Sequence, residues 1–130
     1  MNYKDTVRYW LTSAKDDYKA SCSLFDKGNY MPSLFFAHLY IEKVMKALYV
    51  YRHRQQAPFG HNVALLAEKS GITFDEDLWD FLYTITEFNI KTRYPDHKFK
   101  IKKRCNKRYT EKILDKTRKT ALWLRRQIKL

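Results

Sequence analysis

Residues 33–54 read SLFFAHLYIEKVMKALYVYRHR, and this stretch decides the fold. Its apolar residues recur at steps of three and four, which predicts a helix. One face of that helix is Leu34, Ala37, His38, Ile41, Met45 and Leu48. Further apolar side chains lie on its other faces. A helix that is apolar nearly all round is either central in a bundle or shared with a second subunit.

The rest of the chain predicts four more helices around this one. An apolar stripe in the first 27 residues ends at Gly28, and glycine favours the left-handed stop of a helix. Thr73 and Glu76 have the spacing of a capping box, which marks another helix start. The expected helices are residues 3–27, 33–54, 63–70, 73–89 and 107–129. Residues 92–105 are expected to form a loop, since Pro95 has no place inside a helix.

The composition agrees with one small domain. The 130 residues include 45% hydrophobic residues, which gives room for a single core and excludes a disordered tail. Only 3 Gly and 3 Pro leave little material for the many turns of an all-β fold. We therefore expect one all-α domain over residues 1–130, folded as an up-and-down bundle of four or five helices.

The sequence also indicates a compartment. No apolar run approaches the ~20 residues that span a bilayer, and the first residues lack the pattern of a secretory signal. Cys22 and Cys105 are 83 positions apart, make no metal spacing and are expected to be free thiols in a reducing environment. The expected location is the cytoplasm, with no membrane partner.

Positive charge is concentrated in the last third of the chain. Residues 1–90 hold 10 Lys and Arg against 11 Asp and Glu, whereas residues 91–130 hold 16 against 3. The last 40 residues therefore carry a formal charge of +13 and the first 90 carry −1, which together make the net charge of +12. This excess is more than solubility requires. It predicts an anionic partner, with nucleic acid as the first candidate and an acidic protein surface as the second.

The expected nucleic-acid-binding residues form two groups. The first group surrounds Phe99 and Ile101 in the expected loop, and the second shares one face of the last helix with Trp123. The residues are Lys98, Lys100, Lys102, Lys103 and Arg104 in the loop, and Arg108, Lys112, Lys116, Lys119 and Arg126 on the helix. Cations neutralise phosphates and release counterions, while aromatic faces stack on exposed bases.

Several polar residues have expected structural roles. His38 lies on the apolar face of residues 33–54 and is expected to be a hydrogen-bonded core residue, while His53 is expected at an exposed helix end. Glu42 and Lys46 form an i,i+4 pair, worth a few tenths of a kcal/mol if exposed. Asp17 is expected to face water, off the buried stripe of its helix.

Two Arg–His pairs are candidates for catalysis. Arg54 precedes His61 with six residues between them, and Arg93 precedes His97 with three. Histidine acts as a general acid or base near neutral pH, and arginine stabilises charge that develops on phosphorus, so such a pair suits RNA cleavage. A structural role is favoured for His61, whose ring either caps the following amides or hydrogen-bonds back to the core.

Other catalytic classes find no support in the sequence. The four histidines have no metal-ligand spacing, and no carboxylates cluster beside them. There is no Gly-rich phosphate loop. The acidic residues of 75–80 sit at an expected helix start, where the helix dipole explains them. We expect neither a metal nor a cofactor.

Short motifs follow one another along the chain in a known order. They are Trp10, Ala14 and Asp17; Gly28-Asn29-Tyr30 before Pro32-Ser33; AHLYIEKVMKAL at residues 37–48; Gly60-His61-Asn62 with Leu65-Leu66; and Arg93-Tyr94-Pro95-Asp96. Together they resemble the HEPN domain, the higher eukaryotes and prokaryotes nucleotide-binding domain. The resemblance covers roughly residues 5–128.

The resemblance implies a bundle of four to five helices, a homodimer and the binding of nucleotides or RNA. Many members of the family are paired with a minimal nucleotidyltransferase as a toxin–antitoxin module. Some are metal-independent endoribonucleases that use Arg, four to six residues, then His. In this chain Arg93 and His97 are one residue too close, and Arg54 and His61 lie in a different part of the fold.

The leading hypothesis is a non-catalytic HEPN-type module that binds nucleic acid or nucleotides through its basic segment. One alternative is an endoribonuclease that uses an Arg/His pair. Another is a protein-interaction subunit that docks on an acidic nucleotidyltransferase without direct contact to RNA.

Overall fold

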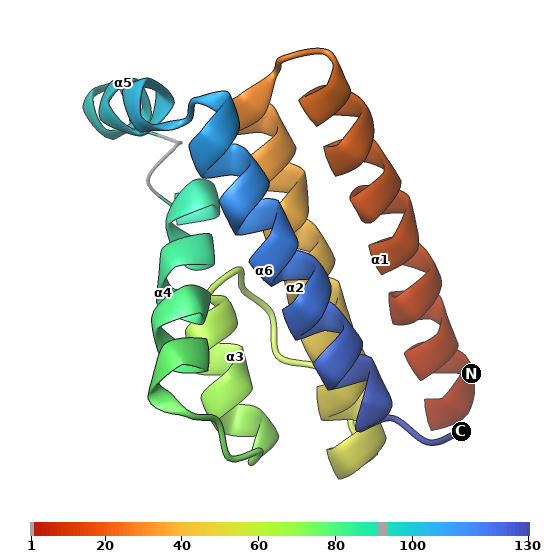
Figure 1. Cartoon of the computed structure of the whole chain (residues 1–130). Coiled ribbons are helices and arrows are strands. Elements are labelled where there is room, and N and C mark those ends of the chain that lie inside the picture. Colours follow the sequence, from red (N-terminus) through yellow and green to blue (C-terminus); the bar gives the residue numbers. More distant parts are fainter. Residues whose placement is uncertain (1, 91–93) are drawn as a thin grey trace.

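The computed structural model describes residues 2–90 and 94–130 and is drawn in Figure 1. These residues form an all-α bundle, as the sequence predicted. The helices are α1 (Tyr3–Asp26), α2 (Tyr30–His53), α3 (Val63–Ser70), α4 (Glu76–Ile90), α5 (Pro95–Arg104) and α6 (Lys107–Arg126).

Helix α2 is the centre of the bundle. Helices α1, α3, α4 and α6 all pack against it, and together they cover its apolar faces (Figure 1). Its fully buried side chains meet those of its neighbours in one core. The largest members are Leu34, Ile41, Met45, Leu48, Leu82, Ile85, Phe88 and Leu124.

Helix α1 lies along α2 over most of its length. Asn2 caps its start, because the Asn2 side chain accepts a hydrogen bond from the Asp5 amide at 2.9 Å. Near its other end, two buried serines join the helices. The Ser21 hydroxyl donates to the Ser33 carbonyl at 2.7 Å, and the Ser33 hydroxyl donates to the Ser21 carbonyl at 2.8 Å. These small side chains let the two backbones approach closely.

The start of α4 corrects one prediction. The cap is Asp75 and not Thr73, since the Asp75 carboxylate accepts a hydrogen bond from the Leu78 amide at 2.8 Å. Helix α4 therefore begins at Glu76, three residues later than predicted. An aspartate satisfies the free amides and also carries the negative charge that the helix dipole favours, so it is a strong cap.

The expected loop at residues 92–105 is wrong where the structure describes it, because Pro95–Arg104 form helix α5. Pro95 is the first helical residue, where its fixed φ suits a helix and its missing N–H costs nothing. Asp96 lies in the first turn and three cations lie in the last, which matches the helix dipole. Ile101 is buried and holds α5 against the bundle.

Helix α6 has one core face and one solvent face. Asn106 caps it by accepting a hydrogen bond from the Tyr109 amide at 2.8 Å. The helix ends at Arg126, three residues before the predicted end. Its buried residues are Thr110, Ile113, Leu114, Thr117, Thr120, Ala121 and Leu124. Among the helices described here, none has a stretch of sufficient length and apolarity to cross a bilayer.

Candidate nucleic-acid interface

All ten predicted binding residues are exposed on α5 and α6. Helix α5 projects from one end of the bundle, at the upper left of Figure 1, while α6 runs the length of the molecule. Residues 95–112 alone hold eight Lys and Arg against two acidic residues. The basic segment is thus a projecting helix joined by a short turn to a basic helix face.

Helix α5 also exposes aromatic rings. Phe99 is 63% exposed and Tyr94, at the α5 cap, is 62% exposed. The Lys103 ammonium lies 4.9 Å from the centre of the Phe99 ring. Open aromatic faces beside cations are what single-stranded nucleic acid needs for stacking and phosphate contact. Tyr94 was not predicted as a binding residue, although its aromatic ring next to the basic run is a signal that the sequence carries.

Ion pairs occupy two of the predicted residues. The Arg104 guanidinium lies 3.0 Å from the Glu87 carboxylate, and the Lys119 ammonium lies 3.0 Å from the Asp115 carboxylate. Both pairs are exposed, so each contributes little to stability. Each still reduces the positive field that its cation presents to a ligand.

An acidic rim covers part of the α6 face. A groove of about 660 Å³ separates α4 from α6, and its α6 side includes Lys116 and Lys119. Its α4 side carries three carboxylates: Asp75, Asp77 and Asp80. From the sequence, the helix dipole alone explained these aspartates. Their closeness to α6 arises from the packing of α4 against the bundle, which the local pattern does not contain.

The structure therefore divides the ten predicted cations into two classes. Arg104, Lys116 and Lys119 lie in an ion pair or across the groove from the acidic rim, and the other seven do not. Within the described part of the chain, no ion pair engages Lys98, Lys100, Lys102, Lys103, Arg108, Lys112 or Arg126. All of these except Arg126 lie on α5 or in the first two turns of α6. The strongest uncompensated field thus surrounds α5.

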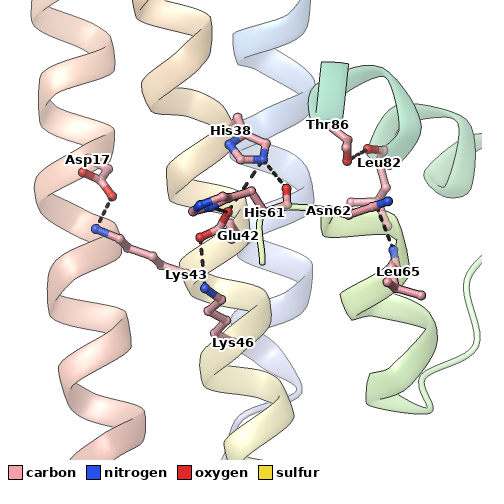
Figure 2. A network of polar contacts seen from close by, with 10 residues as sticks. All are labelled: Asp17, His38, Glu42, Lys43, Lys46, His61, Asn62, Leu65, Leu82 and Thr86. Carbon is pink, nitrogen blue, oxygen red and sulfur yellow. Dashed lines mark hydrogen bonds and ion pairs between the residues drawn. The ribbon is translucent and has the colours of Figure 1, made fainter. Parts of the chain in front are cut away.

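A second polar cluster lies at the centre of the molecule (Figure 2). Glu42 on α2 is almost completely buried, with 4% of its side chain exposed. One carboxylate oxygen accepts a hydrogen bond from the His61 ring at 2.9 Å, and the other accepts one from Lys46 at 3.2 Å. The predicted Glu42–Lys46 pair is thus buried rather than exposed, and it includes a histidine from the loop before α3.

His38 completes this cluster and is the core residue that the sequence predicted. It is fully buried, and its Nε2 lies 2.8 Å from the main-chain oxygen of His61. A carbonyl only accepts, so Nε2 carries the proton and Nδ1 is bare. Burial is the main reason that the pKa of His38 lies below its ordinary value. His38 and Glu42 together hold the α2–α3 loop onto α2.

Asp17 is another correction. It was expected to face water, but it is 9% exposed and its carboxylate lies 2.7 Å from the Lys43 ammonium of α2. Lys43 also donates a hydrogen bond to the Ser13 hydroxyl at 2.7 Å. The motif residues Asp17 and Lys43 therefore join α1 to α2, which is a structural role.

The candidate catalytic pairs have different surroundings. The Arg54 guanidinium lies 4.5 Å from the centre of the Tyr3 ring, whereas His61 is bonded to Glu42. Arg54 and His61 line two different pockets. His97 is exposed in the first turn of α5. Its predicted partner Arg93 lies outside the described residues. Across the residues described, no group of His, Cys, Asp or Glu has an arrangement that suits a metal ion.

Comparison with solved structures supports the same architecture. The crystal structure of TT1696 from Thermus thermophilus superposes with a TM-score of 0.80 at 23% sequence identity, covering 98% of this chain and 100% of that one. The two chains thus share their fold. No curated protein matches the chain. Among protein families, the HEPN domain matches residues 7–127. The chain therefore belongs to the HEPN domain family, whose members are nucleotide-binding and ribonuclease-type modules.

Proposed function

We propose that this protein binds single-stranded RNA through α5 and the first turns of α6, and that it does not cut the RNA. The observation that carries the proposal is the projecting helix α5, with its unpaired lysines beside exposed Tyr94 and Phe99. The lysines neutralise phosphates, and the two rings offer faces on which bases stack. Nucleotide binding as a property of the family supports the same assignment.

The test is fluorescence anisotropy with a labelled single-stranded RNA across a salt series. Replacing Lys98, Lys102 and Lys103 with alanine is expected to weaken binding at least about tenfold and to lower the salt slope by about two. The matched control replaces Lys4, Lys15 and Lys19, three exposed lysines of α1, with the same loss of charge. Equal losses for both triple variants would show that only net charge matters and would contradict the proposal.

The absence of cleavage has its own test. Purified protein is incubated with the same RNA, and the products are separated by electrophoresis. We expect intact RNA after long incubation. Cleavage that is lost in Arg93→Ala or His97→Ala would instead establish the endoribonuclease alternative, with the basic surface as its substrate-binding site.

We also propose that the protein works as a cytoplasmic homodimer beside a minimal nucleotidyltransferase, as one half of a toxin–antitoxin pair. Its support is family membership together with the basic surface, which also suits an acidic protein. Sedimentation of the pure protein tests the dimer. Co-purification tests the protein partner. A partner that binds the triple alanine variant of α5 as tightly as it binds the unsubstituted protein would dock on a surface other than α5.

A further inference from the structure

Helix α4 is the acidic part of a basic protein. Residues 71–90 hold five Asp and Glu and no Lys or Arg, whereas the whole chain has a formal net charge of +12. Glu76, Asp77 and Asp80 are exposed, and within the described part of the chain none of them forms an ion pair. The helix dipole favours acidic residues in the first turn only, so it does not account for Asp80 in the second turn.

The outer side of α4 also exposes an aromatic ring among these carboxylates. Glu76, Asp80 and Tyr83 recur at steps of four and three, so they lie on one side of the helix. Tyr83 is 62% exposed, and its ring centre lies 6.3 Å from that of Trp79, one turn earlier. This side, with Glu76, Asp80 and Tyr83, is named the acidic face of α4. Exposed aromatic surface with a polar rim is typical of a surface that binds another protein.

The exposed side of α5 has the same pattern with the opposite charge. Lys98 and Lys102 are four positions apart, as Glu76 and Asp80 are on α4, and the exposed ring of Phe99 lies beside them. Because a helix rises about 1.5 Å per residue, the two pairs have the same spacing of roughly 6 Å along their helices. Opposite charges at matched spacing, with an aromatic ring on each side, make the two surfaces complementary.

Within one molecule these two surfaces lie apart. In Figure 1, α4 starts at the lower end of the bundle and ends beside α5 at the upper end. The Arg104–Glu87 ion pair, at 3.0 Å, joins α5 to the last turns of α4. Glu76 is eleven residues before Glu87, which is about 16 Å along the helix and too far for a lysine of the same α5. The start of α4 can therefore meet an α5 helix only in a second molecule.

Two molecules can make this contact twice. Helices α4 and α5 lie on the same side of the bundle in Figure 1. When two copies lie side by side in opposite directions, the α5 helix of each copy faces the start of α4 in the other. Such a pair has two-fold symmetry, so each contact is repeated. Screening limits charge interactions to about 8 Å at physiological salt, which favours the adjacent opposite charges over repulsion between distant parts of two positive molecules.

We propose that α5 docks on the acidic face of α4 in a second copy of this chain, and that this contact and RNA binding exclude each other. The inference rests on the proposed function, because the lysines that meet Glu76 and Asp80 are those that meet phosphates in an RNA complex. Protein without RNA thus covers its own binding surface, and RNA separates the pair. A homodimer formed through any other surface would leave α5 open to RNA.

The experiment is sedimentation velocity at high protein concentration, with and without a short single-stranded RNA. We expect a dimer that dissociates as the salt concentration rises from about 0.05 M to about 0.5 M, since screening weakens exposed ion pairs. Added RNA is expected to convert the dimer into RNA-bound monomers. The triple alanine variant of α5 is expected to dimerise at least about tenfold more weakly, whereas the matched triple variant of α1 keeps the dimer.

The decisive variants reverse the charge of one surface at a time. Glu76→Lys with Asp80→Lys reverses the acidic face and is expected to weaken dimerisation at least about tenfold. Lys98→Glu with Lys102→Glu is expected to have the same effect from the α5 side. A mixture of the two variants regains opposite charges at both contacts, so a heterodimer is expected. Circular dichroism of each variant checks that the helices are intact.

The control for charge is Asp16→Lys with Asp26→Lys. Both residues are exposed on α1, and the change in net charge equals that of the reversed α4 variant. This control is expected to keep the dimer, because α1 carries neither of the two surfaces. Equal loss of the dimer in the control and in the reversed α4 variant would show that net charge alone decides association, and it would overturn the proposal.

Three further results would overturn the proposal. One is a protein that stays monomeric at every salt concentration, and another is a dimer that binds RNA without dissociating. The third is a mixture of the two reversed variants that remains monomeric although both are folded. RNA affinity is measured in dilute protein, where monomers prevail, so none of these results changes the test of RNA binding by α5. Failure of this contact is therefore distinct from failure of the proposed function.

Discussion

The molecule uses lysine and histidine in two opposite ways. Lys46, His38 and His61 surround the buried carboxylate of Glu42, where every charge has a partner and holds a loop to α2. On α5 the same residue types are exposed, and the lysines of 98–103 have no acidic partner among the described residues. Burial with a partner makes a charge part of the fold, whereas exposure without one leaves it available to a ligand.

The largest expected effect comes from breaking the buried cluster. Glu42→Gln removes the only charge that compensates Lys46 in this contact and weakens the hold on His61. Because an uncompensated buried charge is costly, the free energy of unfolding is expected to fall by about 3–5 kcal/mol. Urea denaturation measures it. Glu111→Gln, an exposed substitution on α6, is the control, and equal stability of the two variants would contradict a structural role for Glu42.

The next test loosens α5 without changing a charge. Ile101→Ala removes the buried side chain that holds α5 against the bundle and is expected to cost about 2 kcal/mol, at the low end because α5 lies at the edge. Hydrogen exchange is expected to accelerate in α5 and to change little in α2. Equal acceleration in both helices would show that α5 does not open independently.

A smaller effect concerns the pH dependence of stability. The pKa of His38 lies below its ordinary value, so this side chain takes up a proton more readily in the unfolded chain than in the folded chain. Stability is therefore expected to fall as the pH drops below about 6.5, by up to about 1.4 kcal/mol per pH unit. His38→Gln should flatten this dependence, while His53→Gln at the exposed end of α2 should not. Identical pH profiles in both variants would assign the effect to other groups.

The smallest expected effect concerns the acidic rim of the α4–α6 groove. Asp80→Asn removes one carboxylate from the rim that faces Lys116 and Lys119. Affinity for RNA at low salt is expected to rise by about twofold, since an exposed charge is largely screened. Anisotropy measures it, with Asp16→Asn on α1 as the control. An affinity no higher than that of the original protein would show that the α6 face does not approach the RNA.

The sequence predicted the helices with strong apolar spacing and missed contacts between distant positions. The stretch at 33–54, the cap after residue 27 and the core face of α6 followed from local patterns. The error at α5 arose because Pro95 was interpreted as a helix breaker, although a proline at the first helical position is compatible with a helix. The local sequence pattern alone did not distinguish a proline that breaks a helix from one that begins it.

Prediction of the candidate site also failed where contacts join residues that are distant in the sequence. The exposure of the ten cations was predictable, because no apolar face claims those positions. The distant partners of Glu42 and Asp17 were not predictable, since His61 is 19 positions from Glu42 and Lys43 is 26 positions from Asp17. Those pairs exist only once α1 and the α2–α3 loop lie against α2.

The central position of α2 has a consequence for how the chain is made. Helices α1 and α2 are neighbours in sequence and share the most extensive helix packing among the described residues. We therefore expect them to form a hairpin before the later helices join. The side of α2 that α6 covers stays open until α6 has been translated. During that interval its apolar surface is exposed to other nascent chains and to chaperones. The helix that carries the second group of exposed cations is therefore also the one whose arrival completes the core.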